Sequence, residues 1–163
     1  MSWVFLAGDR VYKLKKPVRF PYLDFSSLPR REAACRAELA LNRRLAPDVY
    51  LDLMPLTITP DGLSISGDGA IADWLVVMRR LDEGQTLEHA ILAGRIEHRQ
   101  LDRLAATLVR FYRTAARPFL SADAHLADWR GRLLFNRRVL LDARLGLPTG
   151  LVRYVDRVQR DFL

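Results

Sequence analysis

Residues 8–20 read GDRVYKLKKPVRF, and this stretch contains all three lysines of the chain, whereas the other 23 basic residues are arginines. Gly8 and Asp9 give the backbone the freedom that a tight turn needs, and residues 3–6 and 11–16 flank them with strand-forming side chains. Pro17 cannot donate to a strand ladder and ends the second segment. The stretch therefore predicts a β-hairpin whose second strand carries the lysines.

The rest of the chain changes from a mixed pattern to a purely helical one. A helix is expected over 27–45, with Ser26 or Ser27 as its N-cap and Pro29 in its first turn. Further strands are expected at 49–59, 63–66 and 70–81, and helices from Thr86 onward at 97–115, 121–145 and 149–163. The continuous apolar run WLVVM (74–78) indicates a central strand. Five antiparallel strands with one helix, followed by helices, make an α+β fold.

Composition and charge place the chain among globular proteins and disfavour a nucleic-acid binder. Of the 163 residues, 50% are hydrophobic and 28% are charged, and the net charge is +7. The arginines occur in scattered pairs among acidic residues rather than in one basic run. The single cysteine, Cys35, cannot form an intramolecular disulfide, and residues 1–10 show neither a signal peptide nor a membrane span. A cytoplasmic protein without a membrane partner is expected.

Lys13 and Glu38 are the two charged residues that local patterning leaves without a partner. Side chains alternate along a strand, so if Tyr12 and Leu14 face a core under the helix, Lys13 faces the other side of the sheet. On the helix, Glu38 falls in the middle of an apolar stripe. The stripe contains Ala34, Leu41 and Leu45, with Cys35 and Asn42 at its edge. A lone carboxylate there would be destabilising, so a cationic partner is expected.

Two interpretations of the lysines stay open at this point. A strand lysine aimed by a helix glutamate is how protein-kinase-like folds hold the α- and β-phosphates of ATP. Lysine suits that task because its ammonium is a compact point charge, whereas the planar arginine fork grips the carboxylate itself. The alternative is a solvated surface lysine, which is also the interpretation given to Lys15 and Lys16 at the strand end.

Residues 2–51, together with DWLVVMRRL (73–81), resemble the N-terminal part of bacterial aminoglycoside phosphotransferase-like proteins, members of the protein-kinase-like superfamily. The resemblance is specific from Trp3 to Leu81 and weaker in the helical tail. It implies a nucleotide-binding, kinase-like N-lobe over residues 1–82. It also implies a hinge and the first helices of a truncated C-lobe over residues 83–163.

The resemblance also implies a set of nucleotide-binding residues. Lys13 would contact the ATP phosphates, Glu38 would be its ion-pair partner, and Val11 would line the adenine pocket. The hinge would be the Met78–Leu81 stretch, with Met78, Arg79 and Leu81 among the binding residues, although Met78 could equally be a core residue. ATP and Mg²⁺ are the implied cofactors.

The chain departs from the family where catalysis would occur. A kinase-like phosphotransferase needs an Asp beside the acceptor hydroxyl, and an Asn and a second Asp on Mg²⁺. No His-Gly-Asp type loop occurs in the 163 residues, and neither Asn42 nor Asn136 has the required spacing. Neither catalytic residues nor metal ligands are therefore expected in this chain.

The sequence favours the N-terminal portion of an ATP-dependent small-molecule phosphotransferase that lacks the catalytic loop. The alternatives are a non-catalytic nucleotide- or protein-binding module and, less favoured, a basic nucleic-acid binder. Helices after Thr86 carry apolar stripes that need a partner, so self-association or contact with a missing C-lobe is expected.

Overall fold

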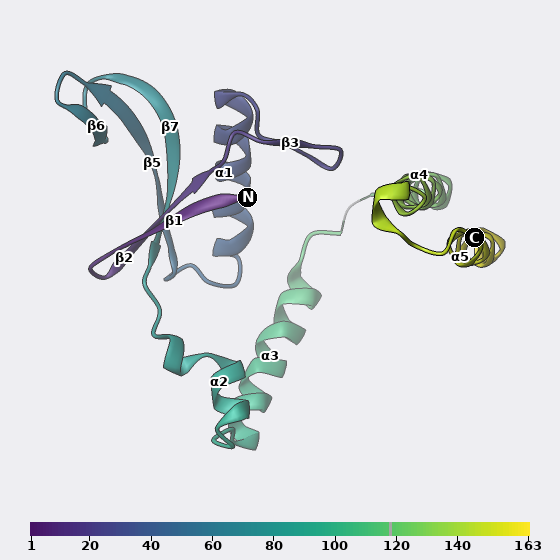
Figure 1. The fold of residues 1–163 in the computed structure, drawn as a ribbon. Helices are drawn as coiled ribbons and strands as arrows, with labels where there is room; N and C mark the ends of the chain where they lie inside the picture. Colours follow the sequence, from purple (N-terminus) through teal and green to yellow (C-terminus); the bar gives the residue numbers. More distant parts are fainter. Residues whose placement is uncertain (118) are drawn as a thin grey trace. The chain divides into compact units, whose positions relative to one another are not determined.

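The computed structural model describes residues 1–117 and 119–163 and divides them into two compact units, Met1–Thr114 and Ala115–Leu163 (Figure 1). The first unit is an α+β fold, as predicted, with a five-stranded antiparallel sheet. The strands of this sheet are β1 (Ser2–Ala7), β2 (Arg10–Lys15), β5 (Tyr50–Thr59), β6 (Gly62–Ile65) and β7 (Ala70–Arg79). A separate two-stranded sheet contains β3 (Arg19–Phe20) and β4 (Leu23–Asp24). The helices of the first unit are α1 (Leu28–Arg43), the 3-10 turn η1 (Glu83–Gln85), α2 (Leu87–Leu92) and α3 (His98–Thr114).

The five-stranded sheet has the order β1-β2-β7-β5-β6, so β7 is the central strand, as its apolar run predicted. The predicted hairpin of β1 and β2 is also confirmed: Ser2 pairs with Lys15 and Ala7 with Arg10. Gly8 adopts a φ of 58° in the turn, a conformation that residues with a Cβ rarely take. The order places β2, with the lysines, directly beside β7.

Helix α1 packs against β7 and β5 on one face of the sheet (Figure 1). Ser27 is its N-cap residue, but its side chain makes no capping hydrogen bond; Ser26 instead donates to Asp24. The preceding stretch forms the two-residue strands β3 and β4. The core between α1 and the sheet contains Cys35 and Val76, both without solvent exposure.

The predicted buried stripe of α1 is wrong in its position. Leu41 and Leu45 are exposed, and the buried residues of the helix are Arg31 and Cys35, with Glu38 mostly covered. The sheet supplies opposite charges to Arg31 and Glu38, so these two polar side chains are accommodated on the covered face of the helix. Apolar periodicity alone therefore gave the wrong rotation of this helix.

The change from strands to helices falls between Arg79 and Glu83, as predicted, whereas the boundary between the two compact units along the chain lies between Thr114 and Ala115. Helix α3 therefore belongs to the first unit, where the Arg44 guanidinium lies 4.5 Å from the ring of Phe111. The apolar stripe predicted on α3 forms, but Leu101, Leu104 and Leu108 remain exposed.

The second unit consists of α4 (Ala122–Leu140), the 3-10 turn η2 (Ala143–Leu145) and α5 (Thr149–Phe162). The two helices pack together with Leu133 and Val152 buried. The Asp142 carboxylate accepts from the N–H of Arg144, so η2 replaces the last turn of the helix expected over 121–145. No helix in the described part of the chain is long and apolar enough to cross a membrane.

Candidate functional site

Three charged side chains from β2 and α1 meet on the helix-covered face of the sheet. Lys13 Nζ lies 2.7 Å from Glu38 Oε1, which confirms the predicted pairing of these two residues. Lys15 Nζ lies 2.6 Å from the other oxygen, Oε2, so each carboxylate oxygen has its own ammonium. The prediction of Lys15 as a solvated strand end is wrong: it is among the buried charged residues of the chain.

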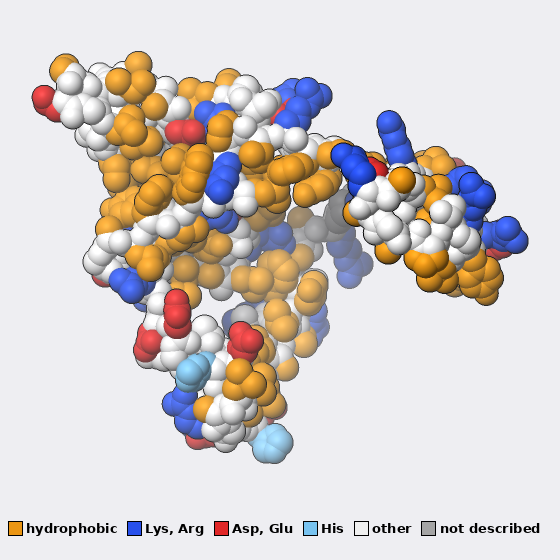
Figure 2. Space-filling view, viewed as in Figure 1, with side chains coloured by type: hydrophobic (Ala, Val, Ile, Leu, Met, Phe, Trp, Pro, Cys, Tyr) orange, Lys and Arg blue, Asp and Glu red, His pale blue; other side chains and the backbone are white. Residues whose placement is uncertain are grey.

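The strand faces are reversed relative to the expectation. Lys13 and Lys15 point toward α1, so Tyr12 and Leu14, which alternate with them, point to the other side of the sheet. There they line an apolar hollow of about 480 Å³ together with Phe5 and Leu75. The space-filling view shows hydrophobic side chains gathered over the strands (Figure 2). Residue alternation predicted which side chains share a face, but not which face meets the helix.

The two lysines together lower the pKa of the Glu38 carboxyl group. Burial would raise the pKa of Glu38, but hydrogen bonds from Lys13 and Lys15, together with their charges, outweigh burial and hold that pKa below its ordinary value. Glu38 is therefore ionised at neutral pH. With two ammonium groups on one carboxylate, the three side chains together carry a net positive charge.

An apolar row lies beside this cluster on the same face. The register pairs Leu6 with Val11 and Val11 with Met78, so these three side chains stand side by side across β1, β2 and β7. Lys13 is two residues further along β2, about 7 Å from Val11. Apolar side chains next to an ammonium group are a suitable surface for a nucleobase with attached phosphates.

The implied hinge, Met78–Leu81, begins with the last two residues of β7, and its backbone is only partly free. The N–H of Arg79 donates to the carbonyl of Val49, and that of Arg80 donates to the carbonyl of Asp9, each at 2.8 Å. Within residues 1–117 and 119–163, the N–H of Leu81 has no hydrogen-bond partner. Leu81 also borders a polar hollow of about 390 Å³ lined by residues 80–83. Of these two implied hinge residues, Leu81 therefore has an N–H that remains available to a ligand in the described structure, whereas the N–H of Arg79 is already bonded.

A second buried ion pair, which the sequence did not reveal, fixes α1 to β7. Arg31 Nε donates to both oxygens of Asp73, at 3.0 and 2.9 Å, and its Nη1 donates to the carbonyl of Phe25 at 3.1 Å. Arg31 precedes Glu38 by two helical turns, so this pair fixes the rotation of the helix that carries Glu38. The Arg31–Asp73 pair is a structural support of the site.

Cys35 lies on α1 between these two ion pairs and provides a chemical probe of their packing. The thiol is buried, and burial raises its pKa to about 11. We expect the native chain to resist alkylation by a thiol reagent at pH 8 and to react rapidly in denaturant. Mass spectrometry of the labelled protein measures both rates. Fast labelling of the native chain would contradict the packing of α1 on the sheet.

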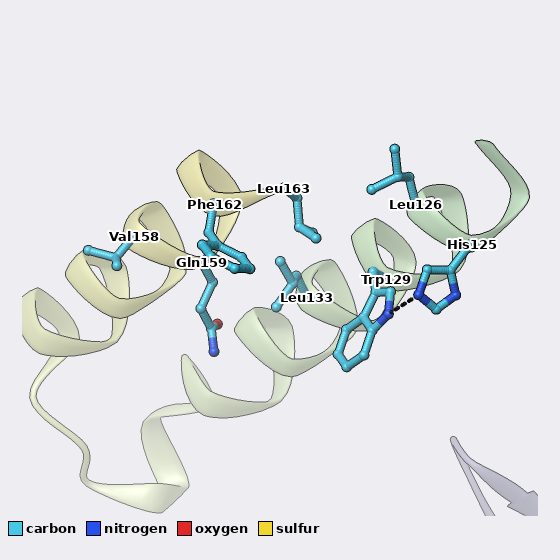
Figure 3. A pocket seen from close by; sticks show the side chains of 8 residues that line it. All are labelled: His125, Leu126, Trp129, Leu133, Val158, Gln159, Phe162 and Leu163. Atoms are coloured by element: carbon cyan, nitrogen blue, oxygen red, sulfur yellow. Dashed lines mark hydrogen bonds between the residues drawn. The ribbon is translucent and has the colours of Figure 1, made fainter. Parts of the chain in front are cut away.

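The cluster Asp123, His125 and Asp128 on α4 makes local contacts. Trp129 Nε1 donates to His125 Nε2 at 3.0 Å, and Asp128 pairs with Arg132. An apolar hollow of about 540 Å³ lies beside His125. Residues of α4 and α5 line it (Figure 3). In the described part of the chain, no three His, Cys, Asp or Glu side chains come together as a possible metal site.

Comparison with known proteins gives relatives but no family. No family model matches the chain, and neither does any solved structure. Proteins described as uncharacterized, from Mycobacterium bovis and from two strains of Mycobacterium tuberculosis, are each 40% identical to it over 114 residues. This alignment covers 70% of the chain but 21% of each relative, so the chain spans about a fifth of the length of the curated relatives it matches.

Proposed function

We propose that the first unit is the nucleotide-binding part of an ATP-dependent small-molecule phosphotransferase. The observation that carries this proposal is the Lys13–Glu38 ion pair, two residues along β2 from the apolar row of Leu6, Val11 and Met78. A strand lysine held by a helix glutamate is the arrangement that positions ATP phosphates in protein kinases. The resemblance of residues 2–51 and 73–81 to aminoglycoside phosphotransferase-like proteins supports the same function.

The exposure of the cluster suits a phosphate ligand. The side chain of Lys13 is 29% exposed, so its ammonium can reach an incoming anion, whereas the carboxylate of Glu38 is covered. The net positive charge of the cluster favours the polyphosphate over an uncharged ligand. An arginine at position 13 would grip Glu38 with two parallel hydrogen bonds and release it less readily.

The residues present fit the nucleotide but not Mg²⁺. Lys13 would hold the α- and β-phosphates, Glu38 would aim the ammonium, and Val11 with Met78 would contact the base. The N–H of Leu81 would donate to the adenine edge. The described residues offer no set of metal ligands, so the role given to this chain is limited to binding and orienting the nucleotide.

The experiment that tests the proposal is equilibrium dialysis of the 163-residue chain with radiolabelled ATP, with adenosine as the control without phosphates. Binding of ATP that exceeds binding of adenosine is expected, because the ammonium of Lys13 acts on the phosphates alone. Absence of ATP binding at millimolar concentrations would refute the proposed function. A cytoplasmic location is part of the proposal, because ATP is available there and the lone Cys35 needs no oxidising compartment.

A phosphate-transfer assay with aminoglycosides and γ-labelled ATP is expected to give no product from the isolated chain. In-line transfer requires a carboxylate that holds the acceptor hydroxyl, and the 163 residues contain no His-Gly-Asp type loop. Robust turnover that depends on Lys13 would contradict this prediction.

The exposed apolar surface supports a second candidate, a protein-binding module. The apolar residues of α3 and the hollow on the far face of the sheet are both open to solvent. We therefore expect the chain to self-associate, with a weight-average mass in sedimentation equilibrium that rises with concentration. Replacing Leu104 and Leu108 with Gln should lower that mass toward the 18.7 kDa of one chain. A strictly monomeric chain at high concentration would contradict this prediction.

A further inference from the structure

Lys15 gives the candidate phosphate site a feature that a simple lysine–glutamate pair lacks. Its Nζ bonds Glu38 Oε2 while Lys13 bonds Oε1, so the two lysines do not compete for one oxygen. The Lys15 ammonium also lies 4.9 Å from the centre of the Phe25 ring, which adds a cation–π contact. Lys15 is thus held from two sides.

The two lysines differ in their access to solvent. The side chain of Lys15 is 7% exposed, against 29% for Lys13, and Glu38 is 14% exposed. An incoming phosphate can therefore reach Lys13 but not Lys15. Lys13 is therefore the accessible member of the cluster, and Lys15 and Glu38 are its more buried members.

Movement of Lys13 toward a phosphate would be costly if Lys13 were the sole partner of Glu38. The mostly buried carboxylate would lose its counter-charge and would repel the approaching anion. With Lys15 in place, the carboxylate remains paired after Lys13 moves. With Lys15 present, Lys13 could bind a phosphate without leaving the Glu38 carboxylate unpaired.

We propose that Lys15 is a positioning residue, which keeps Glu38 neutralised and in place while Lys13 turns from the carboxylate to a nucleotide phosphate. This inference rests on the proposed function, since it assigns Lys13 to the phosphates. The inference adds Lys15 to the residues of the proposed site, although the Lys15 ammonium would not contact the nucleotide.

The test is a double-mutant cycle on the ATP affinity of the 163-residue chain, measured by equilibrium dialysis. Lys15→Met is expected to weaken ATP binding about tenfold, because Glu38 then retains Lys13 and repels the phosphates. In a Glu38→Gln background, the same substitution should change the affinity less than about twofold, because no carboxylate is left to neutralise. Lys15→Arg keeps the charge and should restore most of the affinity.

Lys16→Met is the matched control and should leave the affinity unchanged. The Nζ atom of Lys16 lies over the Trp3 ring, 5.2 Å from its centre, and not beside Glu38. An equal loss from Lys15→Met in both backgrounds would overturn the inference, since Lys15 would then act on the phosphates directly. Unchanged affinity after Lys15→Met would overturn it as well. Lys15→Gln replaces Lys15→Met if circular dichroism shows that the methionine variant is unfolded.

Failure of the proposed function has a different signature. The unsubstituted chain would then show no ATP binding, and the inference would fall with it. Failure of the inference alone leaves ATP binding and its dependence on Lys13 intact, with Lys15 either dispensable or itself in contact with the phosphates.

Discussion

Glu38→Ala is expected to lower the free energy of unfolding of the first unit by about 3 to 5 kcal/mol, which is the usual cost of removing one partner of a buried ion pair. The substitution leaves two ammonium groups next to each other without a counter-charge. Lys13 can turn toward solvent, but Lys15 cannot, because its side chain is 7% exposed. The loss therefore comes mainly from a stranded charge on Lys15.

Glu32→Ala is the matched control on the same helix. Glu32 pairs with Arg36 one turn away on the helix surface, and such pairs contribute about 0.3 to 0.5 kcal/mol. Urea unfolding can be followed through the reactivity of the Cys35 thiol, which reports on the first unit alone. Similar midpoints for both variants would show that Glu38 is not a buried partner of the lysines.

The pH dependence of stability offers a further check on Glu38. Its pKa is lowered in the folded chain, so its ionised form contributes stability above the ordinary carboxylate pKa. That contribution is lost as the pH falls through the lowered pKa, because the protonated form loses its attraction to Lys13 and Lys15. Glu38→Gln should therefore remove part of the acid sensitivity that the unsubstituted chain shows. Identical acid unfolding profiles would contradict the assignment.

Lys13→Met is expected to weaken ATP binding by about tenfold to a hundredfold, the range of a charge-assisted hydrogen bond of roughly 1.5 to 3 kcal/mol. Methionine keeps an apolar stem of similar length and removes the charge. The variant should remain folded, because Lys15 still neutralises Glu38. Adenosine binding should be unchanged, since in the proposed site the base would contact Val11 and Met78 rather than the ammonium.

Lys16→Met serves as the control for Lys13→Met in the same dialysis experiment. Lys16 is the third lysine of the segment, but it makes no contact with Glu38 in the described structure, so ATP affinity should not change. Equal losses from Lys13→Met and Lys16→Met would indicate attraction by net charge rather than a site. Strong salt dependence of binding would accompany that outcome.

Local patterns predicted the five strands of the main sheet, the four long helices and the pairing of Lys13 with Glu38, but not the short elements β3, β4 and α2. The turn at Gly8, the alternation along β2 and the apolar run of β7 each depend on neighbouring residues. The burial of Lys15 against Glu38 was not predictable in the same way. The alternation of side chains along β2 places Lys13 and Lys15 on one face. The neighbouring residues do not indicate whether this face or the face of Tyr12 and Leu14 packs against the helix.

The rotation of α1 was missed for a related physical reason. Its buried side carries Arg31, Cys35 and Glu38, and the two charged residues are buried because β2 and β7 supply opposite charges. The partner of Arg31 is Asp73, 42 positions away in the sequence. Such long-range ion pairs contribute to which face of the helix is buried. They cannot be predicted from the spacing of apolar residues within the helix.

The most direct test of the central claim is an ATP titration of the ¹⁵N-labelled chain followed by two-dimensional NMR. Binding at the proposed site predicts that the largest amide shifts occur at Val11, Lys13, Met78 and Leu81, with no comparable shifts in α4 or α5. Adenosine should shift Val11, Met78 and Leu81 while leaving Lys13 nearly unchanged. Shifts confined to other parts of the chain, or no shifts at millimolar ATP, would contradict a nucleotide site at the Lys13–Glu38 pair.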